Sequence, residues 1–181
     1  MKQTIRIIGG QFRGKKLHFP AIEGLRPTPD RVRETLFNWL MHDICDAHCL
    51  DAFAGSGALG FEAFSRGAAK VSLLEKDPRA HANLLKLALS FHSSKLTVSK
   101  IDATEFLQQT NEHFNIVFLD PPFAKNYLPL CIATLANTNV LQQGGLLYIE
   151  SSQKIVVDES IWQQLKLKEA GQVVYGLYKK K

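Results

Sequence analysis

Residues 50–60 read LDAFAGSGALG, and this stretch decides the fold that we expect. An apolar strand leads into Gly55, Gly57 and Gly60, which have the spacing G-x-G-x-x-G, and a helical pattern follows directly. Such glycines let the backbone turn tightly and approach a ligand closely at the start of a helix. Glu75 closes the next expected strand, where an acid can accept hydrogen bonds from ribose hydroxyls. A packing turn without a ligand is the alternative, and the ordered series of strand, glycines, helix and acid disfavours it.

Short apolar runs alternate with helical patterns along most of the chain. Strands are predicted at residues 49–53, 70–75, 96–101, 115–119 and 146–150, and helices at 58–66, 78–91, 103–109 and 127–141. This order predicts an α/β fold with a mostly parallel sheet and helices on both faces. Residues 165–178 are predicted to add an antiparallel hairpin, which gives seven strands, and the tail at 179–181 is expected to be solvated.

The N-terminal segment is basic and accounts for the formal net charge of +5. Residues 1–35 hold eight basic and three acidic side chains, and the rest of the chain is neutral. Runs at 4–8 and 15–19 flank a glycine-rich tip and predict a β-hairpin. We therefore divide the chain into a basic hairpin arm (1–25) and an α/β domain (26–181). Phe12 at the tip can either stack on RNA or pack beneath the hairpin.

A helix is predicted after the hairpin, with Thr28 as its N-cap and with Arg31 and Arg33 off its apolar stripe. A basic face of this kind suits a polyanion such as RNA, and a solvated surface segment is the alternative. The candidate RNA-binding residues are Arg6, Arg13, Lys15, Lys16, Arg26, Arg31, Arg33 and Lys125.

The residues around the glycine loop favour S-adenosylmethionine over a dinucleotide. Asp51 precedes Gly55 by four residues, and its negative charge would repel a pyrophosphate. S-adenosylmethionine has no phosphate, but it has a positive amino group and a positive sulfonium. Asp102 ends the third expected strand, where it can reach the adenine amino group. The candidate cofactor-binding residues are Asp51, Phe53, Ala54, Gly55, Ser56, Gly57, Glu75, Lys76, Asp102, Ala103 and Asp120.

The fourth expected strand delivers Asp120, Pro121, Pro122 and Phe123 to the same edge of the sheet. An aromatic amine is a weak nucleophile because its lone pair is delocalised into the ring. Two acceptors, the Asp120 carboxylate and the Pro121 carbonyl, favour a reactive nitrogen and stabilise the charge that develops on it. The prolines stiffen the loop, and Phe123 can stack on an extruded base. These four are the candidate catalytic residues, and a rigid turn is the alternative.

The motifs together resemble those of a known family. Residues 51–57 (DAFAGSG) and 120–123 (DPPF) are similar to the motifs of amino-group methyltransferases that use S-adenosylmethionine. The resemblance narrows to the RsmD family through residues 6–10 (RIIGG), 13–14 (RG), 26–28 (RPT), 31–38 (RVRETLFN) and 171–175 (GQVVY). It implies a Rossmann-like methyltransferase with an N-terminal hairpin extension, which methylates N2 of guanine 966 in the 16S rRNA of the small ribosomal subunit.

Other classes of function stay open or are disfavoured. A methyltransferase for amino groups of DNA or of another RNA would share both motifs, although the chain has no room for a separate sequence-reading domain. Asp51 disfavours an NAD-dependent oxidoreductase, and the intact motif at 120–123 disfavours a non-catalytic RNA-binding module.

We expect a cytoplasmic monomer without a metal or a membrane anchor. The spacing H-x-x-C-x-x-H-C at residues 42–49 matches no standard zinc site. Three cysteines are best explained as free thiols, and no apolar run approaches the ~18 residues of a membrane span.

Overall fold

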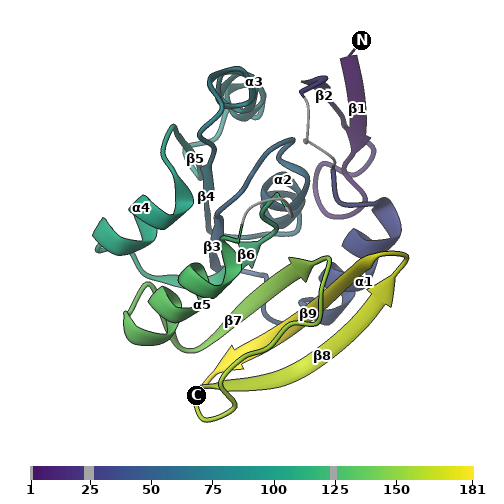
Figure 1. Ribbon diagram of the computed structural model, residues 1–181. Coiled ribbons are helices and arrows are strands. Elements are labelled where there is room, and N and C mark those ends of the chain that lie inside the picture. The colour runs from purple at the N-terminus through teal and green to yellow at the C-terminus, as the bar shows by residue number, and fades with distance from the viewer. Residues whose placement is uncertain (1, 23–26, 123–125) are drawn as a thin grey trace.

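The computed structural model describes residues 2–22, 27–122 and 126–181. Its main sheet has seven strands in the order β5-β4-β3-β6-β7-β9-β8 (Figure 1). The strands are β3 (His48–Asp51), β4 (Lys70–Leu74), β5 (Leu96–Ser99), β6 (Phe114–Leu119), β7 (Leu141–Ser151), β8 (Trp162–Ala170) and β9 (Val173–Lys180). The first five in this order pair in parallel, whereas β9 is antiparallel to both β7 and β8. The predicted mostly parallel sheet is confirmed.

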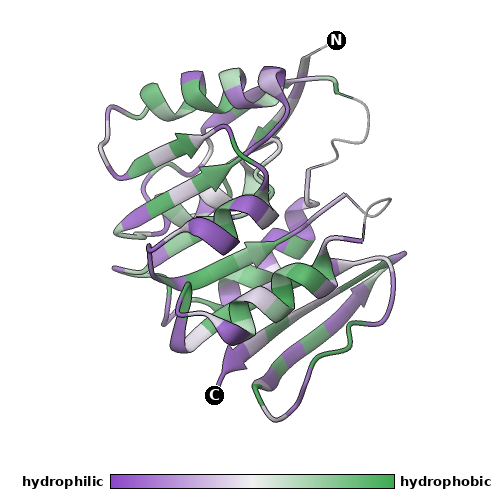
Figure 2. Cartoon of the chain, turned by 60° about the vertical axis from the view of Figure 1, so that its left-hand side comes forward, coloured by the Kyte–Doolittle hydropathy of each residue, from purple (hydrophilic) through white to green (hydrophobic). Residues whose placement is uncertain are grey.

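Helices cover both faces of this sheet. They are α1 (Asp30–Trp39), α2 (Ala58–Ser65), α3 (Pro78–Leu89), α4 (Ala103–Gln109) and α5 (Leu128–Asn137). Successive strand residues point to opposite faces: Cys49 and Phe118 belong to the apolar cluster of α1, α2 and α3, whereas Leu50 and Val117 belong to that of α4 and α5. Figure 2 shows largely hydrophobic central strands between helices that carry both hydrophobic and hydrophilic residues. The predicted arrangement of helices on both faces is also confirmed.

The centre of the sheet provides the natural position for a ligand. β3 pairs with β4 on one side and with β6 on the other, so the connections after β3 and β6 leave from neighbouring strand ends. In open α/β sheets, ligands bind outside the carboxyl ends of the strands at such a switch point. The glycine loop follows β3 and Asp120 follows β6, so the two predicted motifs meet there.

The N-terminal hairpin forms a separate two-stranded sheet and packs onto the body. It consists of β1 (Lys2–Arg6) and β2 (Lys16–Pro20), which pair antiparallel as predicted. Ile5, Ile7, Leu17 and Phe19 are buried in the same cluster as α1 and α2. This burial gives the hairpin a fixed position on the body.

The C-terminal region differs from the prediction at two points. The hairpin of β8 and β9 is present, but α5 ends at Asn137 and β7 begins at Leu141, so the helix is shorter and the strand longer than predicted. The expected solvated tail is wrong at Lys180, which is buried. Its ammonium donates to the carbonyl oxygens of Leu135 and Thr138, both at 2.6 Å, because a cation is favourable at the C-terminal end of a helix. No helix in the described part of the chain has the length and hydropathy to cross a membrane.

Candidate active site

Acidic residues occupy the carboxyl ends of all five parallel strands. They are Asp51 in β3, Glu75 after β4, Asp102 after β5, Asp120 after β6 and Glu150 near the end of β7. The first four are among the predicted site residues. Glu150 is not, although the same signal, an acid at a strand end, also marks this residue. We call the group of Asp51, Asp120 and Glu150 the acidic edge, since these three lie on the central strands.

The glycine loop has the conformation that its glycines predict. Gly55 and Gly57 have φ angles of +51° and +80°, in the left-handed region that favours glycine. A Cβ on Gly57 would lie 2.3 Å from Cε2 of Phe61, and one on Gly60 would lie 2.8 Å from Cδ2 of Leu73. The loop therefore needs glycine for its turn and for close packing of α2.

Two carboxylates brace this loop. The Gly60 N–H donates to Oδ2 of Asp51 at 2.9 Å, and the Gly55 N–H donates to Oε2 of Glu75 at 3.0 Å. Asp51 is only 2% exposed, so it supports the loop and supplies a buried negative charge beneath it. Glu75 is half-buried and keeps free lone pairs for ribose hydroxyls.

The other loop residues contribute mainly backbone. Ala54 and Ser56 are buried, and Phe53 is half-buried against Tyr127, with ring centroids 5.3 Å apart. The surface of the loop that a ligand could contact is therefore largely made of peptide groups.

Asp102 and Lys76 form a second, more open part of the site. Asp102 is the N-cap of α4, in front of the buried Ala103, and its Oδ2 accepts a hydrogen bond of 3.1 Å from Nζ of Lys76. Lys76 also donates to the Tyr127 hydroxyl. Burial acts in the opposite direction, but hydrogen bonds from Thr104 and Lys76 lower the pKa of Asp102. An ionised acceptor is what the predicted contact of Asp102 with the adenine amino group requires.

Asp120 is held by a residue from the other end of the chain. The Thr28 hydroxyl donates to Oδ2 of Asp120 at 3.0 Å. The predicted N-cap role of Thr28 is wrong, because Pro29 occupies that position without a side-chain hydrogen bond and the hydroxyl is used by Asp120 instead. Pro121 is buried and Pro122 is exposed, while Phe123 lies outside the described residues.

The acidic edge has no neutralising cation among the described residues, since none of the ion pairs there includes its members. Burial raises the pKa of Asp51 to about 7, that of Asp120 to about 6 and that of Glu150 to about 8. The negative charge of Asp120 adds to the rise at the other two. Such a site attracts cations and repels phosphate, so it fits S-adenosylmethionine and not the pyrophosphate of a dinucleotide.

The predicted RNA-binding residues differ in exposure. Arg6, Arg13, Lys16 and Arg31 are exposed. Lys15 is half-buried, with its Nζ 3.2 Å from the Ser90 carbonyl oxygen and 3.8 Å from the centroid of the Phe91 ring. Arg26 and Lys125 lie outside the described residues.

Arg33 is wrong as an RNA-binding residue. Its side chain is 1% exposed, and it donates to Oδ1 of Asp30 at 2.6 Å and to the Arg6 carbonyl oxygen at 3.0 Å. A buried acid of α2, Glu62, lies 3.5 Å away on the inner side. The guanidinium faces inward because its charge is compensated there, and no phosphate can reach it.

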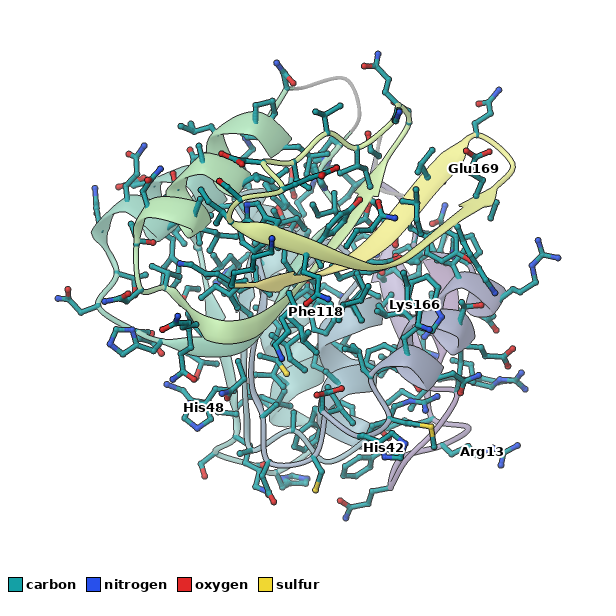
Figure 3. All side chains as sticks on the ribbon, turned by 90° about the horizontal axis from the view of Figure 1, so that it is seen from below. Arg13, His42, His48, Phe118, Lys166 and Glu169 are labelled. Carbon is teal, nitrogen blue, oxygen red and sulfur yellow. The ribbon has the colours of Figure 1, made fainter. Side chains whose placement is uncertain are left out.

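The tip of the hairpin docks on the C-terminal end of α2. The Gln11 N–H donates to the Ser65 carbonyl oxygen at 2.7 Å, and Phe12 stacks on Phe64 with ring centroids 5.3 Å apart. The packing interpretation of Phe12 is therefore confirmed. The glycine loop is at the other end of this helix, about 12 Å away for eight residues at 1.5 Å each. Figure 3 shows Arg13 directed outward from the tip.

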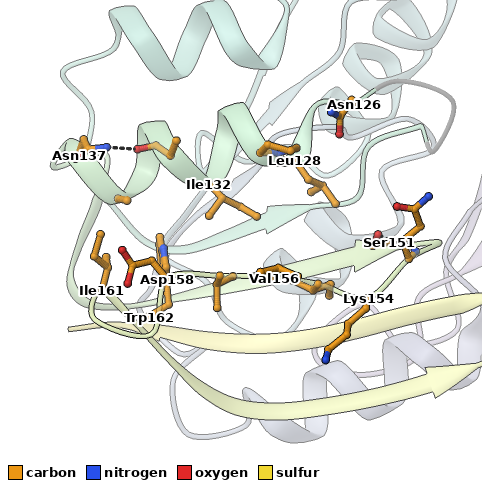
Figure 4. Close-up of a pocket in the computed structure, with 16 residues that line it drawn as sticks. Asn126, Leu128, Ile132, Asn137, Ser151, Lys154, Val156, Asp158, Ile161 and Trp162 are labelled. Atoms are coloured by element: carbon orange, nitrogen blue, oxygen red, sulfur yellow. Dashed lines mark hydrogen bonds between the residues drawn. The ribbon is translucent and has the colours of Figure 1, made fainter.

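Two further features lie apart from these motifs. A cavity of about 480 Å³ opens between α5 and residues 151–162, with Leu128, Ile132 and Trp162 among its apolar lining (Figure 4), and it contains none of the predicted site residues. His42 and His48, part of the H-x-x-C-x-x-H-C spacing, lie far apart (Figure 3). The described residues form no cluster of three or more His, Cys, Asp or Glu side chains suited to a metal ion.

Comparisons with known proteins agree with this geometry. The family model described as Conserved hypothetical protein 95 matches residues 5–179. The chain is 47% identical to ribosomal RNA small subunit methyltransferase D of Escherichia coli K12, over 97% of this chain and 90% of that protein. The protein of the same name from Haemophilus influenzae is 46% identical, over 98% of this chain and 94% of the relative.

Solved structures show the same fold. The Escherichia coli protein yhhF superposes with a TM-score of 0.90 at 46% identity, covering 99% of both chains. The crystal structure of SMU.776 complexed with S-adenosylhomocysteine shares the fold at a TM-score of 0.67 and 16% identity, over 93% of this chain and 52% of that one. From the family match and these identities, the chain belongs to the RsmD family of S-adenosylmethionine-dependent methyltransferases.

Proposed function

We propose that this protein transfers a methyl group from S-adenosylmethionine to the exocyclic N2 of a guanine in the 16S rRNA of the small ribosomal subunit, at position 966 by family resemblance. The observation that carries the proposal is the position of Asp120 and Pro121, which follow β6 directly beside the glycine loop. The names of the relatives from Escherichia coli and Haemophilus influenzae support small-subunit RNA as the substrate.

The described residues suit the activation of an amine. S-adenosylmethionine supplies an electrophilic methyl group on a positive sulfonium and leaves as a neutral thioether. The Asp120 carboxylate and the Pro121 carbonyl each accept one N–H of the target amine, so the nitrogen lone pair is less delocalised and can attack. The methylated nitrogen then loses one proton, and we assign the Asp120 carboxylate as the acceptor of this proton. Two prolines in succession keep this carbonyl in a fixed direction.

The cofactor would be held by residues on the other central strands. The peptide groups of the glycine loop, the Glu75 carboxylate and Asp102 would bind the adenosine part. The negative charges of Asp51 and Asp120 would attract the positive groups of the cofactor. Asp51 would do so from a buried position, without contacting the cofactor directly. Exclusion of phosphate from the acidic edge restricts the pocket to this class of ligand.

RNA would be held outside this pocket by exposed cations. Arg13 and Lys16 at the hairpin, and Arg6 and Arg31 nearby in the chain, are free to contact phosphates of one strand. The hairpin arm (1–25) thus acts as a docking extension of the catalytic domain (26–181). We propose that the protein works as a monomer in the cytoplasm, where small subunits are assembled.

Product analysis tests the proposal directly. The protein is incubated with methyl-labelled S-adenosylmethionine and with small subunits that lack the modification, and the RNA is then digested to nucleosides. We expect label in N2-methylguanosine at a single position, and none with the Asp120→Asn variant. Label in adenine, or transfer to DNA in place of RNA, would contradict the assignment and favour the other amino-group methyltransferases.

A further inference from the structure

Tyr127 belongs to none of the predicted motifs, yet it contacts two candidate residues of the cofactor site. It is half-buried at the N-cap position of α5, seven residues after Asp120. Its hydroxyl accepts a hydrogen bond from Nζ of Lys76, and its ring centroid lies 4.9 Å from the same atom. The ring also packs against that of Phe53, with the centroids 5.3 Å apart. Tyr127 therefore links the start of α5 to the residues that follow β4 and β3.

These contacts cross the carboxyl edge of the sheet from one strand to the next. Asp102 follows β5, Lys76 follows β4 and Phe53 follows β3, and the three strands are neighbours in this order. Nζ of Lys76 donates to Oδ2 of Asp102 at 3.1 Å as well as to Tyr127. Phe53 and Tyr127 both pack against the apolar cluster of α4 and α5. We call the pair of Lys76 and Tyr127 the strap, because it spans the strand ends at the adenosine part of the cofactor site.

The hydrogen bonds of Asp102 decide where a ligand can bind to it. Its Oδ1 accepts from the N–H and from the hydroxyl of Thr104, at 2.9 and 2.7 Å. Among the described residues, its Oδ2 accepts from Lys76 alone. A carboxylate oxygen has about two lone pairs, so Oδ1 is saturated and Oδ2 can accept one more hydrogen bond. An adenine amino group that binds Asp102 must therefore lie next to the Lys76 ammonium.

Tyr127 holds this ammonium beside the ligand position. The ion pair of Lys76 with Asp102 is weak by itself, because the two side chains are 46% and 29% exposed. The hydroxyl and the ring of Tyr127 both contact Nζ, and they restrict a long side chain that otherwise samples many rotamers. Tyr127 is in turn fixed by its packing on Phe53. The strap is thus ordered at the point where the adenine is expected to bind.

We propose that Tyr127 is a further cofactor-binding residue, which acts with Lys76 to close the adenosine end of the pocket. The adenine amino group donates to Oδ2 of Asp102, and the strap lies against the adenine and keeps water away from this hydrogen bond. Because the strap contacts only the adenosine part, it acts equally on every ligand that contains adenosine. This inference rests on the assignment of Asp102 to adenine, which is part of the proposed function.

Calorimetry with two ligands tests the strap without requiring methyl transfer. The ligands are S-adenosylhomocysteine and 5′-methylthioadenosine, which keeps the adenosine part but lacks the amino-acid part. Tyr127→Phe retains the ring and removes the hydroxyl, whereas Lys76→Met retains most of the side-chain length and removes the ammonium. Each change should raise the Kd of both ligands about tenfold, as expected for one lost hydrogen bond.

A double variant measures whether the two residues act together. Tyr127→Phe and Lys76→Met remove the same hydrogen bond, so the Kd of the double variant should equal that of the weaker-binding single variant. Tyr178→Phe is the control for the tyrosine, since it removes a buried hydroxyl without a partner among the described residues. Lys70→Met is the control for the lysine, since it removes a 40% exposed ammonium that pairs with Glu112 at the other end of β4. Both controls should leave the Kd values unchanged.

Four outcomes would overturn the inference. An unchanged Kd in Tyr127→Phe would mean that the strap is not part of the pocket, and a lower Kd would mean that it blocks the adenosine position. A rise for S-adenosylhomocysteine alone would place the contact at the amino-acid part. Effects that multiply in the double variant would mean that the two residues act independently.

Further measurements separate the inference from the proposed function. Asp102→Asn keeps a good N-cap for α4 but replaces Oδ2 by an amide donor, so it should weaken the binding of both ligands. If it does not, the assignment of Asp102 to adenine fails and the strap fails with it. If the wild type binds both ligands but labels no guanine N2, the proposed substrate is wrong, and the calorimetry still decides the role of Tyr127.

Discussion

The buried carboxylate of Glu62 and the carboxylates of the acidic edge have opposite environments. Glu62, in the middle of α2, is fully buried and has four partners: the N–H groups of Ile8 and Gly9, and the guanidinium groups of Arg33 and Arg66. The acidic edge is also buried or half-buried, but no cation neutralises it within the described residues. A compensated buried charge fixes structure, whereas an uncompensated one is available to a ligand.

This difference indicates that Glu62 has a structural role and that the acidic edge has a binding role. Glu62 joins the hairpin, α1 and α2, three segments that are separate in the chain, at one point. Its environment is complete without any other molecule. The charge of the acidic edge is compensated only when a ligand with positive charge and amine donors binds. This is the behaviour expected of a binding site for a sulfonium and an amino group.

The largest expected effect is on stability, from Glu62→Gln. This change leaves Arg33 buried without its full compensation, and breaking a buried ion pair typically costs about 3–5 kcal/mol. Urea unfolding measures the loss. The matched control is Glu112→Gln, which removes a surface pair whose side chains are 40% and 46% exposed, and should cost less than about 1 kcal/mol. Equal losses in the two variants would remove the structural role of Glu62.

The acidic edge should show the reverse pattern in Asp120→Asn. We expect methyl transfer to fall by about 10²–10³-fold, the cost typical of removing one electrostatic contact to a transition state. Stability in urea should not fall, because the change removes an uncompensated buried charge. Binding of S-adenosylhomocysteine by calorimetry controls for the integrity of the pocket. Retained activity, or a loss of stability like that of Glu62→Gln, would show that Asp120 belongs to the structural class.

The sequence predicts the parts of the fold and site that local patterns encode. The glycine loop depends on φ angles and spacing, and the sheet depends on apolar runs, so both follow from residues close together in the chain. Arg33, Lys180 and Thr28 depend on partners 29, 45 and 92 positions away, and in isolation each has a plausible solvated or capping role. Glu150 has no motif around it, because its place at the acidic edge follows only from the pairing of β7 with β6.

A third prediction concerns how the hairpin is docked beside Glu62. Gly10 and Gly14 both have left-handed φ angles, +76° and +87°, but only Gly10 is confined: a Cβ there would lie 1.8 Å from the Ser65 carbonyl oxygen. Gly14 has open space around it. Both alanine variants carry backbone strain of about 1–3 kcal/mol, and Gly10→Ala should lose more because the docking contact must also open. Equal unfolding free energies would mean that the hairpin is not held at Ser65.

The uncompensated charge also predicts a pH dependence of cofactor affinity. Asp51 and Asp120 are neutral below their pKa values of about 7 and about 6, and each gains a negative charge as the pH rises through its value. Affinity for S-adenosylmethionine should therefore increase between pH 6 and 8, by up to about tenfold for one pKa unit of coupling, with release of protons. S-adenosylhomocysteine lacks the sulfonium and is the matched ligand, for which calorimetry should show a smaller increase. The same dependence for both ligands would mean that the acidic edge does not respond to the sulfonium.

The smallest expected effect is on the salt dependence of RNA binding. It distinguishes exposed cations from those that already make contacts within the protein. Arg13→Gln and Lys16→Gln should each lower the slope of log affinity against log salt for small-subunit RNA by about 1, because each removes one phosphate contact. Lys15→Gln should change it less, since this ammonium already contacts Ser90 and the Phe91 ring. Lys166→Gln on the edge strand β8 is a control of equal charge change and should leave the slope unaltered. If Lys166→Gln lowers this slope as much as Arg13→Gln does, RNA binding is distributed over the whole surface. The concentration of charge in the first 35 residues then does not define the docking face.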